Sequence, residues 1–266
     1  MDYKILCENT IAVCKEAGLY IRSQIGKVNA NSIDSKGMHD FVSIVDKTSE
    51  KMIIDKLQKL LPESGFIAEE NTSSKVGEVY NWIIDPLDGT TNFLHGVFPF
   101  AISVALQENN ETVLGIVYEI GFDECFYAWK NSRAYLNGKP IAVSKAKKVA
   151  DTLIATGFPY SNFSKMPQFM LSLDYFMQNS HGMRRLGSAA TDLAYVACGR
   201  YDAFYEYALK PWDVAAGAFI LQQAGGTVSD FSGGQNWLFG QEIVAANANV
   251  FNEFQAVVSK LMNAEQ

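Results

Sequence analysis

The 266-residue sequence lacks the features that mark a membrane, secreted or nucleic-acid-binding protein. No apolar run approaches the roughly 20 residues that a membrane span needs. The N-terminus, MDYKILCENT, carries acidic residues where a signal peptide would have an apolar core. There is no block of Lys or Arg, and the net charge is −7, which gives a nucleic-acid partner little support. We therefore expect neither a membrane nor a nucleic acid as a partner.

Cysteine and histidine are also scarce. The four cysteines lie far apart and form no C-x-x-C pair, and the three histidines show no metal-binding spacing. A reduced, cytoplasmic protein is the simplest interpretation of this cysteine usage.

What is present indicates an ordinary globular chain, with 48% apolar and 19% charged residues. Apolar residues at spacings of three and four predict a first helix near the N-terminus. A second helix is predicted after Asp46 and should stop at Pro62. The polar stretch 28–43 between them is predicted to be irregular. Strands are then predicted at GFIA, NWIID, FAISVAL, VLGIVYE, ECFYAWK and AYLNG, the last with an Asn-Gly hairpin turn.

The second half mixes strands with helices. Helices are predicted at 162–178, 189–198, 212–224 and 249–262, and strands at LIATGF, MRRLG, YDAFYEY and EIVAAN. This pattern predicts a layered protein of mixed α/β (α+β) class. The polar stretch 144–151 could join two subdomains, 1–147 and 148–266, that share one interface.

Acidic residues gather where apolar segments end. Glu69 and Glu70 follow GFIA, Asp85 and Asp88 follow WII, and Asp213 stands at a helix start. Ligand sites collect at strand ends in open sheets. Several carboxylates at one point repel one another, and a hard divalent cation such as Mg²⁺ removes that repulsion through all-oxygen ligation. The pattern is therefore consistent with a metal site.

The residues after these aspartates favour phosphate chemistry. Gly89-Thr90-Thr91-Asn92 could turn directly into a helix and leave free N–H groups facing the carboxylates. Such a helix N-terminus binds anions. Metal carboxylates beside an anion-binding turn together indicate a site that handles phosphate.

Each feature taken alone has a plainer interpretation. Asp-x-x-Asp-Gly is commonly a turn, and Asp46 and Asp213 are each placed as a helix cap. Glu69-Glu70 would ordinarily be a solvated loop. The catalytic hypothesis rests on the conjunction, because independent caps need not all follow buried strands or stand beside a phosphate-type turn.

Glu-Glu followed by WIIDPLDGTTNF, and then PWDVAAG in the second half, resembles the inositol monophosphatase family. SKGMHDFVSIVDKTSE (35–50) and RRLGSAATDLAYVACGRYDAFYE (184–206) are similar to its bacterial members. The similarity covers nearly the whole chain. It implies the layered α-β-α-β-α sandwich of the sugar phosphatases, in agreement with the predicted elements.

The resemblance also implies a set of metal ligands. Glu69, Asp85 and the backbone carbonyl of Leu87 would bind a first Mg²⁺. Asp85, Asp88 and Asp213 would bind a second, so that Asp85 bridges the two. Two such ions about 3.5–4 Å apart clamp both ends of a phosphoryl displacement. Inhibition by Li⁺ is implied as well.

The resemblance assigns catalysis to Glu69, Thr90 and Asp46. Glu69 and the Thr90 hydroxyl would hold a metal-activated water that attacks phosphorus directly, and Asp46 would keep Thr90 in place. The Gly89 and Thr90 N–H groups would hold phosphate oxygens. Glu70 matches a position that could bind a third Mg²⁺.

The substrate's alcohol half is expected next to Glu206, which matches the family residue that hydrogen-bonds sugar or inositol hydroxyls. Glu206 is otherwise a cap or surface residue, and Ser188 could equally be only an N-cap. The substrate contacts implied by the resemblance are those of Asp88, Gly89, Thr90, Gly187, Ser188, Ala189, Glu206 and Asp213.

Several functions remain open on the sequence. The foremost is Mg²⁺-dependent hydrolysis of inositol 1-phosphate by a homodimer of the family's type. Fructose-1,6-bisphosphatase and NADP or 3′-phosphonucleotide phosphatases share the same metal core, so the substrate is a small phosphorylated polyol or nucleotide. An aspartyl-phosphate mechanism needs Asp-x-Asp-x-Thr, whereas these aspartates are three apart with Pro86 between them. A non-catalytic regulatory protein on this fold is the remaining alternative.

Overall fold

The computed structural model describes residues 1–28, 33–37, 40–160 and 162–264. Its α-helices are α1 (Tyr3–Gln24), α2 (Ile44–Leu60), α3 (Thr90–His95), α4 (Met166–Asn179), α5 (Ala189–Ala197), α6 (Pro211–Gln223) and α7 (Phe251–Met262). A short 3-10 helix, η2 (Val149–Asp151), precedes the second half of the chain. Among the described helices, none combines the length and the apolar character that a bilayer span requires.

The larger sheet has the strand order β3-β4-β5-β6-β7-β8-β9. Its strands are β3 (Gly65–Ala68), β4 (Tyr80–Asp88), β5 (Ala101–Glu108), β6 (Glu111–Glu119), β7 (Glu124–Trp129), β8 (Tyr135–Leu136) and β9 (Lys139–Pro140). β3 runs parallel to β4, and the later neighbours are antiparallel. The parallel pair places the carboxyl ends of β3 and β4 side by side, and these ends carry the first acidic residues of the candidate site.

The smaller sheet has the order β11-β10-β12-β14-β13. Its strands are β10 (Leu153–Thr156), β11 (Gly182–Arg184), β12 (Ala203–Tyr207), β13 (Gly226–Ser229) and β14 (Glu242–Asn247). β10 is parallel to both of its neighbours, whereas β14 is antiparallel to both of its own. β1 (Ile33–Gly37) and β2 (Asp40–Ser43) form a separate antiparallel pair.

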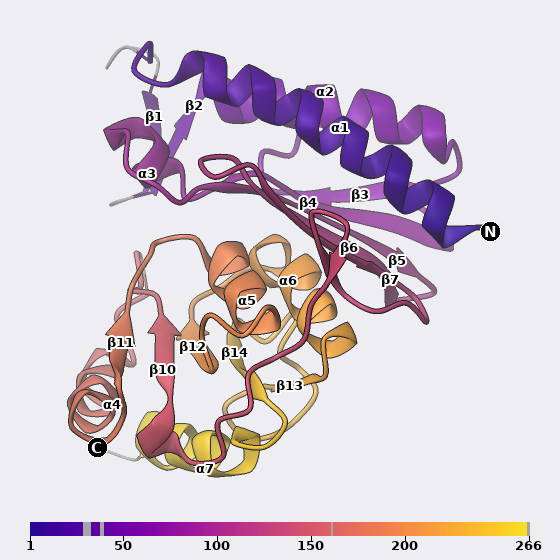
Figure 1. Ribbon diagram of the computed structural model, residues 1–266. Coiled ribbons are helices and arrows are strands. Elements are labelled where there is room, and N and C mark those ends of the chain that lie inside the picture. The colour runs from indigo at the N-terminus through magenta and orange to yellow at the C-terminus, as the bar shows by residue number, and fades with distance from the viewer. Residues whose placement is uncertain (29–32, 38–39, 161, 265–266) are drawn as a thin grey trace.

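The helices and sheets alternate in five layers (Figure 1). Helices α1 and α2 cover the outer face of the larger sheet, and α5 and α6 lie between the two sheets. Helices α4 and α7 cover the far face of the smaller sheet. This α-β-α-β-α arrangement confirms the predicted fold class.

The central helix layer is the most apolar part of the molecule. Every residue of α5 is buried, and α6 is buried from Val214 to Leu221. Both contribute to one core cluster with side chains of the larger sheet, including Ile83 and Phe126. Because this cluster crosses from one half of the chain to the other, a subdomain boundary between residues 147 and 148 stays a prediction.

Local signals explain most element boundaries. Asp2 caps α1 by accepting hydrogen bonds from the N–H groups of Lys4 and Ile5. Asn137 and Gly138 both have positive φ, 48° and 82°, as a two-residue hairpin turn with this sequence requires. The predicted hairpin is thus confirmed as β8 and β9.

Three sequence expectations differ from the structure. Residues 33–37 and 40–43, predicted to be irregular, form β1 and β2, while 29–32 and 38–39 of that stretch lie outside the described residues. α2 begins at Ile44, so Asp46 lies buried in its first turn and is not the cap before it. β4 continues through Asp88 instead of ending at Asp85, because a bulge lets the strand pass Pro86 without a regular ladder.

Candidate active site

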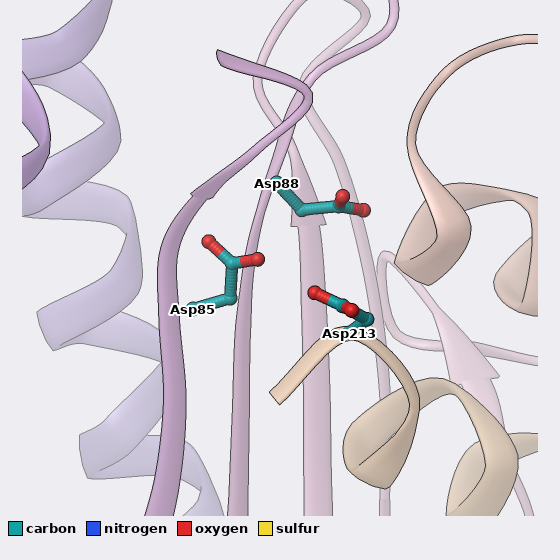
Figure 2. Close-up of side chains that lie close together, drawn as sticks. All are labelled: Asp85, Asp88 and Asp213. Carbon is teal, nitrogen blue, oxygen red and sulfur yellow. The ribbon is translucent and has the colours of Figure 1, made fainter. Parts of the chain in front are cut away.

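A bulge near the end of β4 brings two aspartates to the same side of the sheet. Side chains three positions apart in a regular strand face opposite sides. The register of β4 against β5 shifts between Asp85 and Asp88, where Pro86 cannot donate a ladder hydrogen bond. Figure 2 shows the carboxylates of Asp85 and Asp88 reaching into one space. The D-P-L-D spacing therefore follows from the bulge.

The third carboxylate of the group comes from the other half of the chain. Asp213 lies in the first turn of α6 and accepts a hydrogen bond from the Lys210 N–H at 2.7 Å. The Ser103 hydroxyl of β5 donates to the Trp212 carbonyl at 2.9 Å and ties this turn to the larger sheet. As a result, one oxygen each from Asp85, Asp88 and Asp213 all lie within 4.8 Å of one another.

These carboxylates are electrostatically strained. Burial raises the pKa of Asp85 well above its usual range, and the charges of Glu69, Asp88 and Asp213 raise it further. Burial, Asp88 and Glu69 have the same effect on the pKa of Asp213. The pKa of Asp88 rises to about 6 because of burial, although hydrogen bonds from Ser188 and Ala190 oppose the shift. The three groups resist being charged together.

The donor set fits a hard divalent cation. It offers only carboxylate oxygens, and the mutual repulsion that raises the pKa values is what a bound cation relieves. The Leu87 carbonyl oxygen lies in the same turn, 3.0 Å from the Thr90 hydroxyl oxygen. The observed geometry thus allows Asp85, Asp88 and Asp213 to hold a metal ion.

Glu69 and Glu70 stand beside this group at the end of β3. The Glu69 N–H donates to the Ile84 carbonyl at 3.2 Å, which places Glu69 next to Asp85 across the parallel strand pair. The turn is held by Glu50, a buried residue of α2 that accepts from the N–H groups of Glu70 and Thr72 at 2.7 and 2.8 Å. The sequence analysis did not single out Glu50. Its place on the inner, apolar face of a helix was a signal that it is buried and has hydrogen-bond partners.

Gly89 and Thr90 follow Asp88 and begin α3. Gly89 has φ 91°, a conformation that favours glycine, and a Cβ there would make a tight contact of 3.0 Å with the Gly187 carbonyl. The Thr90 hydroxyl lies 2.8 Å from Asp46 Oδ1, its hydrogen-bond acceptor on α2. Asp46 thus makes the contact with Thr90 that the family resemblance implied.

The start of α5 faces this turn from the second half of the chain. Ser188 is the N-cap of α5, and its hydroxyl also donates to Asp88 Oδ2 at 2.6 Å. The Ala190 N–H donates to the same oxygen at 2.8 Å. Gly187 has φ 86° and precedes the cap. Ser188 is therefore both the predicted cap and a direct neighbour of the acidic group.

A cavity of about 60 Å³ opens beside Asp88 and Asp213. Its lining includes the predicted residues Gly187, Ser188, Ala189 and Glu206, together with four that were not predicted, Gly157, Tyr160, Asp192 and Leu209. Glu206 is 6% exposed on β12, so its interpretation as a surface residue is wrong. A Cβ on Gly157 would lie 2.0 Å from Glu206 Oε1, so glycine at the end of β10 leaves room for this carboxylate.

The fold and the site define a layered α/β protein with an acidic, cavity-forming site between two chain halves. Comparison with known proteins gives the family: the sequence matches the inositol monophosphatase family over residues 4–263. The chain belongs to this family, as its signature stretches indicated.

Individual relatives carry two kinds of name. A protein of Neisseria meningitidis serogroup A, 42% identical over 92% of this chain and 94% of its own, is named a putative Nus factor SuhB. A protein of Mesorhizobium japonicum, 38% identical over 96% of both chains, is named inositol-1-monophosphatase. The crystal structure of the extragenic suppressor protein suhB of Bartonella henselae is 36% identical, with a TM-score of 0.91 over 96% of this chain and 99% of its own.

Proposed function

We propose that the protein hydrolyses a small phosphate monoester with Mg²⁺, and that inositol 1-phosphate is the preferred substrate. The observation that carries this proposal is the meeting of Asp85, Asp88 and Asp213, from two distant parts of the chain, beside the Gly89-Thr90 turn and a cavity. Membership of the inositol monophosphatase family supports the reaction class, and relatives named inositol-1-monophosphatase support the substrate.

In this proposal Glu69, Asp85, the Leu87 carbonyl, Asp88 and Asp213 hold two Mg²⁺ ions, and Glu70 is a candidate ligand for a third. When bound, the ions neutralise the carboxylates, lower the pKa of water and stabilise charge on the transferring phosphoryl group. Inhibition by Li⁺ belongs to the same proposal.

The chain's own groups position the reactants. Asp46 accepts the Thr90 hydroxyl hydrogen, so a lone pair of Thr90 Oγ1 is free to accept from the attacking water. Glu69 takes the proton of that water as its oxygen bonds to phosphorus. The ester P–O bond breaks, the leaving alcohol oxygen takes a proton from a solvent water, and Glu69 returns the proton that it accepted to solvent. The N–H groups of Gly89 and Thr90 donate to the phosphate oxygens, where negative charge develops.

Glu206 stands on the alcohol side of the cavity. Because it is buried, it selects for a partner that can donate hydrogen bonds, and a polyol hydroxyl does so. The Gly187-Ser188-Ala189 turn borders the same cavity and completes the alcohol side.

The test is a comparison of kcat/KM at fixed Mg²⁺ for inositol 1-phosphate, fructose 1,6-bisphosphate, 3′-phosphoadenosine 5′-phosphate and NADP⁺. We expect the highest value for inositol 1-phosphate and no turnover of any ester in excess EDTA. A full rate in EDTA would contradict the metal-dependent reaction. If one of the other three esters is preferred, the proposed reaction stands, and that ester replaces inositol 1-phosphate as the proposed substrate.

The relatives named Nus factor SuhB favour a second candidate, a non-catalytic regulatory role on the same fold. Experiments can separate hydrolysis from the regulatory role. A variant that cannot hydrolyse phosphate esters would keep a regulatory role that depends only on the protein surface. The expectation that no nucleic acid binds stays a prediction.

We also propose a homodimer in the cytoplasm. Exposed apolar side chains near the start of β5 and the end of β6, among them Val97, Phe98 and Phe122, are of the kind that subunit contacts cover. The four cysteines are free thiols, as suits a reducing compartment. Sedimentation of the purified protein would test the oligomeric state.

A further inference from the structure

Two buried acidic side chains line the alcohol side of the cavity, and only one of them, Glu206, was expected there. The other is Asp192, the single charged residue of the apolar helix AATDLAYVA. It is 1% exposed, and Glu206 is 6% exposed. A carboxylate so deeply buried is costly unless hydrogen bonds or a counter-charge compensate it.

The protein itself supplies little compensation. Asp192 Oδ1 is buried and has no hydrogen-bond partner among the described residues. Burial and the neighbouring acidic groups raise the pKa of Glu206 well above its usual range, and no hydrogen bond from the described part of the chain counteracts that rise. Asp88, which borders the same cavity, accepts hydrogen bonds from Ser188 and Ala190. Asp192 and Glu206 therefore have acceptor capacity that a molecule in the cavity could use.

Arg185 supplies a positive charge at this wall. Its guanidinium lies over the rings of Phe158 and Tyr160, 5.1 and 5.9 Å from their centroids, and donates to the Tyr160 hydroxyl at 3.1 Å. Its Nη1 lies 2.8 Å from where a Cβ of Gly187 would be, next to a residue that lines the cavity. Arg185 Nε is buried and has no hydrogen-bond partner among the described residues, and the positive charge of Arg185 opposes the burial-driven rise in the pKa of Asp192.

The chemistry of the wall points to hydroxyl groups. A cationic ligand would be repelled by the positive charge of Arg185. An apolar ligand would leave the buried carboxylate oxygens without hydrogen bonds. A hydroxyl both donates and accepts, so it can serve a carboxylate and a guanidinium together. The cavity volume of about 60 Å³ exceeds the roughly 10–15 Å³ that one water-sized group needs. There is room for more than one hydroxyl.

We propose that Asp192 is a specificity-determining residue that accepts a hydrogen bond from a second hydroxyl of the substrate's alcohol half. The preferred ester is then the phosphate of a polyol with at least two free hydroxyls, one bound by Glu206 and the other by Asp192. This inference rests on the proposed function, because it concerns the alcohol side of the same site.

The first experiment compares inositol 1-phosphate with p-nitrophenyl phosphate, whose leaving group has no hydroxyl to donate before cleavage. Asp192→Ala should lose about tenfold to a hundredfold in kcat/KM on inositol 1-phosphate and stay within about twofold on the aryl ester. Asp192→Asn keeps an acceptor oxygen and should lose less. Tyr195→Phe, which removes a hydroxyl one turn further along α5 and outside the cavity, is the matched control and should keep the wild-type ratio.

Equal losses on both esters would overturn the inference, since a merely structural Asp192 affects every substrate alike. A second measurement does not depend on how well the variant folds. Wild type and Asp192→Ala are compared on inositol phosphates that each lack one hydroxyl. Within each protein, the rate on inositol 1-phosphate is divided by the rate on the analogue. Removal of the contacted hydroxyl should lower turnover strongly in wild type and little in Asp192→Ala, and if no analogue behaves in this way, the contact does not exist.

Binding separates a failure of this inference from a failure of the proposed function. If wild type hydrolyses neither ester with Mg²⁺, the proposed function is wrong. The calorimetric affinity for inositol 1-phosphate then still tests whether Asp192 contacts the ligand. Weaker binding to Asp192→Ala than to Tyr195→Phe would support the role of Asp192. Equal binding to the two variants would overturn it.

Discussion

The phosphate side and the alcohol side of the candidate site hold their carboxylates in different ways. On the phosphate side the protein supplies donors: Leu87 N–H to Asp85, Ser188 and Ala190 to Asp88, and Lys210 N–H to Asp213. On the alcohol side, Asp192 Oδ1 has no hydrogen-bond partner among the described residues, and no hydrogen bond from them lowers the raised pKa of Glu206.

This difference indicates what each side is built to do. Hydrogen bonds fix the direction of the phosphate-side carboxylates, as a metal site needs, since ligands must be oriented before the ion binds. The alcohol-side carboxylates keep their lone pairs for a ligand, which suits recognition of hydroxyls. In the proposed function, one half of the candidate site is fixed by hydrogen bonds within the protein, and the other half receives its hydrogen bonds from the substrate.

The largest expected effect comes from removing the central carboxylate of the phosphate side. Asp85→Asn should lower Mg²⁺-dependent turnover of every ester about a thousandfold, because metal ions supply several kcal/mol of transition-state stabilisation. Calorimetry should show that affinity for both ions falls together, since Asp85 is the proposed bridge. The control is Glu119→Gln, which changes a buried carboxylate outside the site. Unaltered metal affinity in Asp85→Asn would contradict the assignment.

A smaller and more selective effect is expected on the alcohol side. Gly157→Ala adds a methyl group 2.0 Å from Glu206 Oε1 and must displace this carboxylate. We expect turnover of inositol 1-phosphate to fall about tenfold, with the aryl ester little changed. Shortening the acid in Gly157→Ala/Glu206→Asp should recover part of the loss, and steady-state kinetics on both esters would measure it. A loss that is the same for the two esters would remove the distinction between the sides.

The smallest expected effect is on stability. Folding raises the pKa of Asp88 to about 6, so the folded protein binds more protons than the unfolded chain between about pH 4 and 6. The metal-free protein should therefore lose stability as pH rises through this window. The raised pKa values of Asp85 and Asp213 extend the loss to higher pH. In EDTA, we expect Tm to fall by several degrees between pH 5 and 7.5.

Differential scanning calorimetry with and without Mg²⁺ would check this. Mg²⁺ should raise Tm at pH 7.5 more than at pH 5, because metal binding requires ionised carboxylates. Asp85→Asn should have a flatter pH profile in EDTA. A wild-type profile no steeper than that of the variant would show that the acidic group is not strained.

The sequence predicted the helices and most strands because their patterns are local. Apolar spacing indicated a helix where α1 lies, and Asn137-Gly138 located a hairpin turn. β13 was missed, since GTVS is too short to show a period. The start of α2 was also missed, because Asp46 was taken for a cap when it is a buried residue of the first turn.

The site was partly predictable for a different reason. Asp85, Asp88 and Asp213 could be proposed because a family signature surrounds them, and the structure brings them together. Gly157 lies outside the family-like stretches, and Asp192 and Glu50 lie within them at positions to which the resemblance assigned no role. Their roles depend on what lies opposite, such as the Glu206 carboxylate that fills the space beside Gly157.

The sequence by itself determined the fold class, the family and the residue types of a phosphate-handling site, because periodicity, caps and contiguous motifs are written along the chain. Only the tertiary structure decided that Asp85 and Asp88 point the same way, since that depends on a bulge against β5. It also decided that Asp192 and Glu206 are buried on one wall, since α5 and β12 meet only when the layers pack.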